Sequence, residues 1–251
     1  MSIFGFPPET SGGADIVPIV KYDARAGRMF RIDRVQTATG FTSDQVDITG
    51  NGDATSRGNF KAMCDFENIE VGWFNFTPGV APSIIVVKRG AMLPPKPSEQ
   101  HKYGLQFMLK LGKEIGGDTP IRKISGTSRA FRNAFEHIVG VWDAEHKAHP
   151  GQLPVLMFDG LPMPVTTGQG QRQSTNYHPK FRIAGWAPRG DLVYVPQPTA
   201  PQAGAQQTVQ TVQTPVQTVQ TNGAAPATGQ QRVAAPVAQQ NVAADFASDF
   251  G

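Results

Sequence analysis

The stretch KYGLQFMLKL, residues 102–111, decides the fold class of this chain. Apolar and polar residues alternate along it, which is typical of a β-strand with two unlike faces. The alternation predicts a strand with Tyr103 and Phe107 on one face. Lys102 and Lys110 then lie on the face that lacks these aromatic residues.

Further strands are predicted on both sides of this one, because short runs rich in β-branched and aromatic residues end near Gly or Pro. These runs are residues 16–22, 29–35, 45–49, 60–66, 70–76, 83–89, 153–158 and 181–186. A Gly-Asn-Gly-Asp turn is expected at 50–53, and a polar loop at 166–176.

One segment, residues 127–147, has a helical period instead. Its apolar residues recur every three or four positions, as on the buried side of a helix: Phe131, Phe135, Ile138, Val139 and Trp142. The order of strands, one helix and two closing strands predicts a mainly β domain built as an OB-like, partly open β-barrel with extra strands. A β-sandwich with one helix fits the same pattern.

The chain divides into three parts by composition. Residues 1–195 hold 20 of the 22 aromatic residues and form the predicted OB-like nucleic-acid-binding domain. Residues 196–244 are rich in Gln, Ala, Thr and Pro, and such a segment buries too little apolar surface to offset the entropy of ordering it. We therefore expect a disordered linker there, followed by a short tip at 245–251.

Several protein classes are excluded by absent signals. The longest aliphatic run, residues 84–87, is far shorter than a membrane helix, and the first residues lack the features of a signal peptide. Cys64 is the single cysteine, so neither an intrachain disulfide nor a cysteine-based zinc site is expected. His146 and His149 are better explained as exposed side chains at a helix end than as metal ligands. We expect a soluble cytoplasmic protein that is not an enzyme and has no cofactor or metal.

Positive charge gathers in two stretches of the predicted domain. Residues 21–34 carry five bases and two acids, and residues 71–142 carry ten bases and four acids. Basic stretches mixed with aromatic residues are typical of single-stranded nucleic-acid binding, in which cations hold phosphates and aromatic rings stack on bases. An ordinary solvated surface would also explain the charge.

The candidate DNA-binding residues combine both kinds of side chain, with Tyr22 and Trp73 as the preferred stacking rings. They are Lys21, Tyr22, Arg25, Arg28, Arg31, Trp73, Lys88, Arg89, Lys102 and Lys110. Four further bases, Arg122, Lys123, Arg129 and Arg132, would extend the positive field.

The tip repeats an acidic residue followed by phenylalanine, at Asp245-Phe246 and Asp249-Phe250. An acidic and aromatic tip on a flexible tether is the form of a docking peptide, in which the acids meet a basic rim and a ring fills a pocket. We expect these four residues to bind a partner protein.

In this architecture and in these two Asp-Phe pairs, the chain resembles bacterial and especially phage-encoded single-stranded DNA-binding proteins. One departure is that Gly251 follows Phe250, so the terminal carboxylate is not on the aromatic residue. The resemblance implies a protein that coats single-stranded DNA during phage replication and recombination in a bacterial cytoplasm. It also implies that the tip recruits replication or recombination proteins, and that it occupies the basic groove when DNA is absent.

Two other functions fit the sequence. A phage structural or assembly protein could combine a β-rich body with a low-complexity arm, and a host-takeover factor such as a nuclease inhibitor could use the basic face to bind a protein. A homo-oligomer is compatible with each of these readings.

Overall fold

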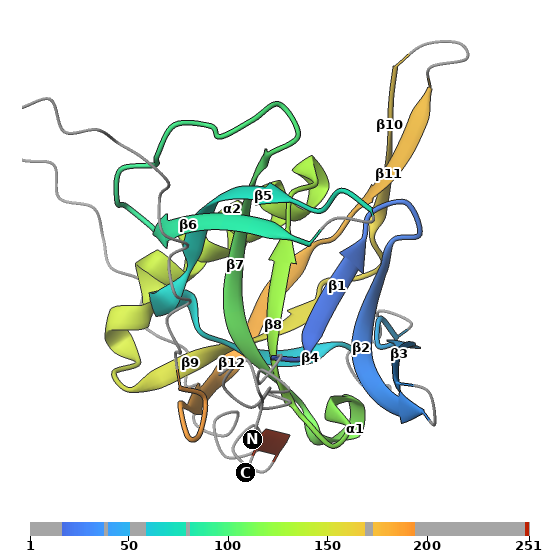
Figure 1. Ribbon diagram of the computed structural model, residues 1–251. Helices are drawn as coiled ribbons and strands as arrows, with labels where there is room; N and C mark the ends of the chain where they lie inside the picture. The colour runs from blue at the N-terminus through green and yellow to red at the C-terminus, as the bar shows by residue number, and fades with distance from the viewer. Residues whose placement is uncertain are drawn as a thin grey trace, which may run out of the picture.

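A computed structural model describes residues 17–37, 40–50, 59–78, 81–168, 173–193 and 249–250 (Figure 1). The whole predicted linker, residues 196–244, and Asp245 and Phe246 of the predicted tip lie outside these residues. The described part is mainly β-structure with one long helix, which confirms the predicted fold class at that level.

The elements follow the chain in this order. The strands are β1 Ile19–Asp23, β2 Arg28–Thr37, β3 Gly40–Asp47, β4 Lys61–Cys64, β5 Glu70–Asn75, β6 Ser83–Lys88, β7 Lys102–Leu111, β8 Ile121–Gly126, β9 Gln152–Phe158, β10 Met163–Thr167, β11 Ser174–His178 and β12 Phe181–Pro188. The helices are α1 Lys113–Gly116 and α2 Arg129–Glu145, with short 3-10 turns at Phe66–Asn68 and His146–Ala148.

Ten strands form one sheet. Eight of them follow the order β12-β9-β4-β7-β8-β1-β2-β3; of the other two, β5 pairs with β7, and β6 pairs with β5. The long strand β7 lies at the centre of this sheet. It pairs along one side with β8 and along the other first with β5 and then with β4. The two ends of the path, β12 and β3, are not paired with each other in the part of the chain described. The sheet therefore does not close there, and the OB-like barrel stays a prediction.

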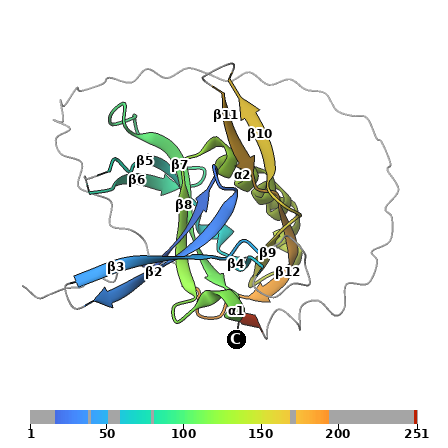
Figure 2. The same ribbon diagram turned by 90° about the vertical axis from the view of Figure 1, so that its right-hand side faces the viewer.

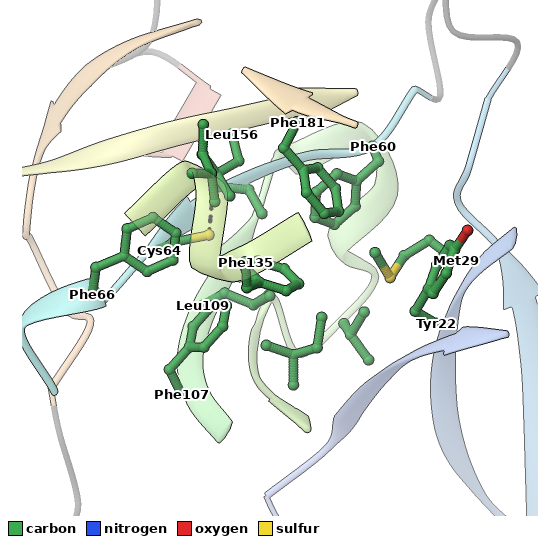
Figure 3. Close-up of a cluster of buried hydrophobic side chains, with 14 of the residues drawn as sticks. Tyr22, Met29, Phe60, Cys64, Phe66, Phe107, Leu109, Phe135, Leu156 and Phe181 are labelled. Atoms are coloured by element: carbon green, nitrogen blue, oxygen red, sulfur yellow. Dashed lines mark hydrogen bonds between the residues drawn. The ribbon is translucent and has the colours of Figure 1, made fainter. Parts of the chain in front are cut away.

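The main core lies between the sheet and helix α2. Ser128 caps the helix by accepting a hydrogen bond from the Phe131 backbone N–H at 3.2 Å. The helix then buries Phe131 and Phe135, and the Phe135 ring lies 5.1 Å from that of Phe107 in an edge-on arrangement (Figure 3). Because Phe107 and Tyr22 belong to this same cluster, β7 and β1 are fixed relative to the helix.

Residues 166–167 and 174–176 were expected to lie in a polar loop, and they instead belong to strands β10 and β11, whereas residues 169–172 of that expected loop lie outside the described part of the chain. The hairpin β10–β11 forms a separate two-stranded sheet that projects from the body (Figures 1 and 2). Its base is tied to β1, since the Tyr22 hydroxyl donates to the Tyr177 carbonyl at 2.9 Å and the Tyr177 N–H donates to the Ala24 carbonyl at 2.6 Å.

Among the described residues, no helix has the length and apolar character that a bilayer crossing requires.

Candidate nucleic-acid interface

Three predicted cations from distant parts of the sequence converge on one hollow. Lys21 lies on β1, Arg25 on the turn after it, and Lys102 at the start of β7, and all three side chains are exposed. The hollow has a volume of about 430 Å³. It is lined by Lys21, Tyr22, Asp23, Ala24, Arg25, Lys102, Thr127, Ser128 and Asn176.

The turn that presents Arg25 is fixed by a side chain. The Asp23 carboxylate accepts hydrogen bonds from the backbone N–H groups of Arg25 at 2.9 Å and Ala26 at 3.1 Å. Gly27 completes the turn with a φ of 68°, which glycine adopts without steric cost. The Asp23 carboxylate, which lines this hollow, is thus bound by backbone N–H groups. Lys21, Arg25 and Lys102 outnumber this single acid, so the net charge of the hollow is positive.

A second hollow of about 350 Å³ adjoins the first, because both are lined by Lys21, Tyr22, Thr127 and Ser128. Phe76, directly after β5, lines it and is 48% exposed. The Phe76 ring lies 5.9 Å from that of Phe74, and its exposed part is accessible to a base, as binders of single strands require. Phe76 was not among the candidate residues, because the aromatic sequence of residues 70–76 gave no sign that this ring would be exposed.

Helix α2 begins between the two hollows. Backbone N–H groups in a first helical turn lack partners within the helix, and the dipole adds positive potential there. Thr127 and Ser128, at this end, line both hollows. These two residues and Asn176 carry no sequence signal for binding, because polar side chains at a helix start or on a hairpin are common everywhere.

Tyr22 lies at this site but does not present its ring, which corrects the expectation of a stacking residue. The side chain faces the core on the same side of β1 as Val20, and Tyr22 is 8% exposed. Burial raises the pKa of its phenol well above the ordinary value, and the hydroxyl is engaged with Tyr177. Its position is structural: it holds the hairpin beside the hollow.

Arg28 and Arg31 lie on β2 and are engaged by carboxylates. Arg28 forms an ion pair with Asp47 on β3. Arg31 pairs with Asp33 at 2.8 Å and donates to the Ile115 carbonyl at 2.8 Å. Neither arginine lines the hollow that Lys21, Arg25 and Lys102 share.

The candidates on β5 and β6 lie in another region. The Trp73 indole N–H donates to the Pro94 carbonyl at 2.7 Å, and its ring meets Tyr103 edge-on at 6.0 Å. Lys88 donates to the Asn68 side-chain oxygen at 3.4 Å. Trp73 and Lys88 line neither hollow.

Arg89, just after β6, belongs to the packing of helix α2. Its guanidinium binds both oxygens of Asp143, at 2.7 and 2.8 Å, and lies 5.4 Å from the centre of the Trp142 ring. Arg89 therefore ties the end of β6 to the helix.

Arg122, expected to extend the positive field, is fully buried. It donates to Asp33 at 2.6 Å and to the Ile32 carbonyl at 2.9 Å, so its charge is neutralised inside the fold. Arg132, in contrast, lies with its guanidinium 5.5 Å from the centre of the Tyr103 ring.

Lys110 and the described part of the tip lie together at the far end of β7. Lys110 pairs with Asp191 at 2.8 Å and also donates to the Phe250 carbonyl. Asp249 pairs with Lys61 at 2.6 Å, and Phe250 is buried. These two tip residues do not line the hollow around Lys21, and one of them, Phe250, contacts Lys110, one of the lysines expected to bind DNA.

In the described ranges, no three His, Cys, Asp or Glu side chains gather as a metal site would require. No protein-family model, curated protein or solved structure matches this chain.

Proposed function

We propose that this protein binds single-stranded DNA without sequence preference, during phage DNA replication or recombination, through an OB-like domain. The observation that supports this most is the convergence of Lys21, Arg25 and Lys102 on one hollow, with the exposed Phe76 ring in the adjoining one. Cations for phosphates beside a ring for a base are the combination that single strands require.

The rest of the surface around the hollows supports the same ligand. The start of helix α2 adds backbone donors that suit phosphate oxygens. Hairpin β10–β11 contributes Asn176 to the first hollow and projects beyond it, which lengthens the surface along which a strand can lie (Figure 2). Charge and stacking carry little sequence information, so the binding is nonspecific.

The proposal is tested by fluorescence anisotropy of labelled oligo-dT and a matched duplex, titrated with the full chain over a range of salt concentrations. For single strands, each phosphate contact contributes about −0.7 to the slope of log K against log salt. The triple variant Lys21→Ala, Arg25→Ala and Lys102→Ala should therefore flatten the slope by about 2. A control that removes three exposed lysines elsewhere, Lys96, Lys113 and Lys147, should leave the slope nearly unchanged.

The stacking part is tested separately with Phe76→Ala. Base–aromatic stacking is worth about 1–3 kcal/mol per base, so the affinity for oligo-dT should fall by about 5- to 150-fold. The salt slope should not change, because no charge is removed. Met92→Ala, at a residue that is 94% exposed and lines neither hollow, is the matched control.

Equal binding to oligo-dT and duplex would refute the proposal. So would equal losses in the hollow variant and the lysine control. Either result would favour a phage structural or assembly protein, in which the basic surface has no nucleic-acid ligand.

A further inference from the structure

The side chain of Phe250 fills an apolar seat on the body. Phe250 is 6% exposed although it is the penultimate residue of the chain. Its cluster is formed by Met63, Met108, Leu153, Val155, Ala187 and Leu192, and Val17, Ile121 and Ala184 pack at the margin. Strands β4, β7, β9 and β12 supply most of these side chains, so the seat is built on the sheet itself.

Two lysines beside the seat bind the polar groups of the tip. Lys61 on β4 pairs with the Asp249 carboxylate at 2.6 Å. Lys110 on β7 donates to the Phe250 carbonyl and is itself held by Asp191 at 2.8 Å. An apolar seat with cations at its rim selects an acidic residue followed by an aromatic one, which is the sequence of the tip.

The seat lies beside the last described residues of the body, and this position indicates that its occupant is the chain's own tip. Leu192 belongs to the seat, and the described body stops at Val193. Leu192 and Phe250 therefore lie in one cluster although 57 positions of the sequence separate them. The chain's own tip can reach the seat without crossing the molecule.

The seat is distant from the candidate interface. Lys102 lines the first hollow and Lys110 the rim of the seat, and eight positions of β7 separate them, roughly 26 Å at about 3.3 Å per residue. The C-terminus lies at the opposite end of the molecule from hairpin β10–β11 in both views (Figures 1 and 2). Asp249 and Phe250 thus lie away from both hollows.

We propose that this surface is a peptide-binding site for the chain's own Asp249-Phe250 end, which holds the tip against the body. Any protein that binds the tip then competes with the seat. The site does not depend on the proposed DNA binding, since it shares no residue with the two hollows.

The test uses a fluorescein-labelled peptide of residues 243–251 and the full chain, with anisotropy as the readout. In a chain that carries both Phe246→Ala and Phe250→Ala, the tip has no aromatic ring to place in the seat, so the seat is open to the peptide. In the wild-type chain, the ring of Phe250 occupies the seat. With an effective concentration of about 1 mM for the tethered tip and a Kd of about 100 µM, the wild-type chain binds the peptide about tenfold more weakly. The chain with Phe246→Ala alone should behave as wild type, and a peptide with Phe250→Ala should not bind.

A charge exchange tests the seat from the body side. Lys61→Asp in the double-alanine chain should abolish binding of the normal peptide, and a peptide with Asp249→Lys should restore it. Lys113→Asp, an exposed lysine outside the cluster, is the control and should change nothing.

Equal peptide affinity for the wild-type and double-alanine chains would overturn the proposal. So would retention of the peptide by the Lys61→Asp chain. Sedimentation of the wild-type chain shows whether the seat binds the tip of the same chain or of another. We expect the wild-type chain to sediment as a monomer. Self-association that Phe250→Ala abolishes would instead assign the seat to the tip of a second copy.

Discussion

Asp33 holds two arginines, and its replacement by alanine should lower the stability of the fold substantially. One carboxylate oxygen accepts from Arg122 at 2.6 Å and the other from Arg31 at 2.8 Å. Arg122 is fully buried, and its Nε already lacks a hydrogen-bond partner. Burial lowers the pKa of this guanidinium, and the Asp33 carboxylate opposes that effect.

Removing one member of a buried ion pair leaves an uncompensated charge and costs about 3–5 kcal/mol. Asp33 is 27% exposed at its side chain, so we expect the lower end, about 3 kcal/mol in the free energy of unfolding. For a domain of this size that lowers Tm by roughly 6–12 °C. Urea unfolding followed by circular dichroism and a calorimetric scan measure both quantities.

Asp44→Ala is the control, because Asp44 is exposed and lies directly opposite Asp33 on β3. Like charges in that arrangement repel, so its removal should be neutral or slightly stabilising, within about 0.5 kcal/mol. Adding Arg122→Met to Asp33→Ala should recover part of the loss, since no buried charge then remains. A loss below about 1 kcal/mol for Asp33→Ala would refute the reasoning.

Two further predictions concern the base of hairpin β10–β11. Gly27→Ala should lower the free energy of unfolding by at least about 1 kcal/mol more than Gly151→Ala. Both glycines have a positive φ, but only at Gly27 would the added carbon lie 2.8 Å from the Tyr177 ring. Equal losses in urea unfolding would contradict this. Stability should also fall as the pH rises from about 9 to about 11, because the phenol of Tyr22 ionises near its ordinary pKa of about 10 when unfolded and stays protonated when folded. Tyr22→Phe should lower stability by about 1 kcal/mol through its lost hydrogen bond and flatten this pH dependence, and an unchanged pH profile would count against the burial argument.

The fold was predictable where one face of an element is apolar. The alternation at 102–111 gave β7 with its observed ends, and the helical period at 127–147 gave α2 within two residues at each end. Strand β8 was missed because one of its buried residues is Arg122, and a buried charge does not register as an apolar face. Hairpin β10–β11 was missed for the opposite reason, since most of its side chains are exposed.

The sequence allowed us to predict which types of residue form the candidate site. It did not allow us to predict which of the candidate residues lie together in the structure. Lys21, Arg25 and Lys102 were identified from charge, and the sheet brings them to one hollow. Charge could not reveal that Arg28 pairs with Asp47, because that contact depends on the register of β2 against β3. The first residues of β3, Gly-Phe-Thr-Ser-Asp, show no apolar alternation from which the pairing could be inferred.

The order of strands in the sheet also determines when the chain can fold during synthesis. Strand β1 pairs with β8 and strand β4 pairs with β9, so each of these early strands has one partner that is about a hundred residues later in the sequence. Loops of that length are slow to close, and the unpaired strands remain exposed until they do. The nascent chain therefore cannot complete this sheet until β9 and β12 have left the ribosome, near the end of the body.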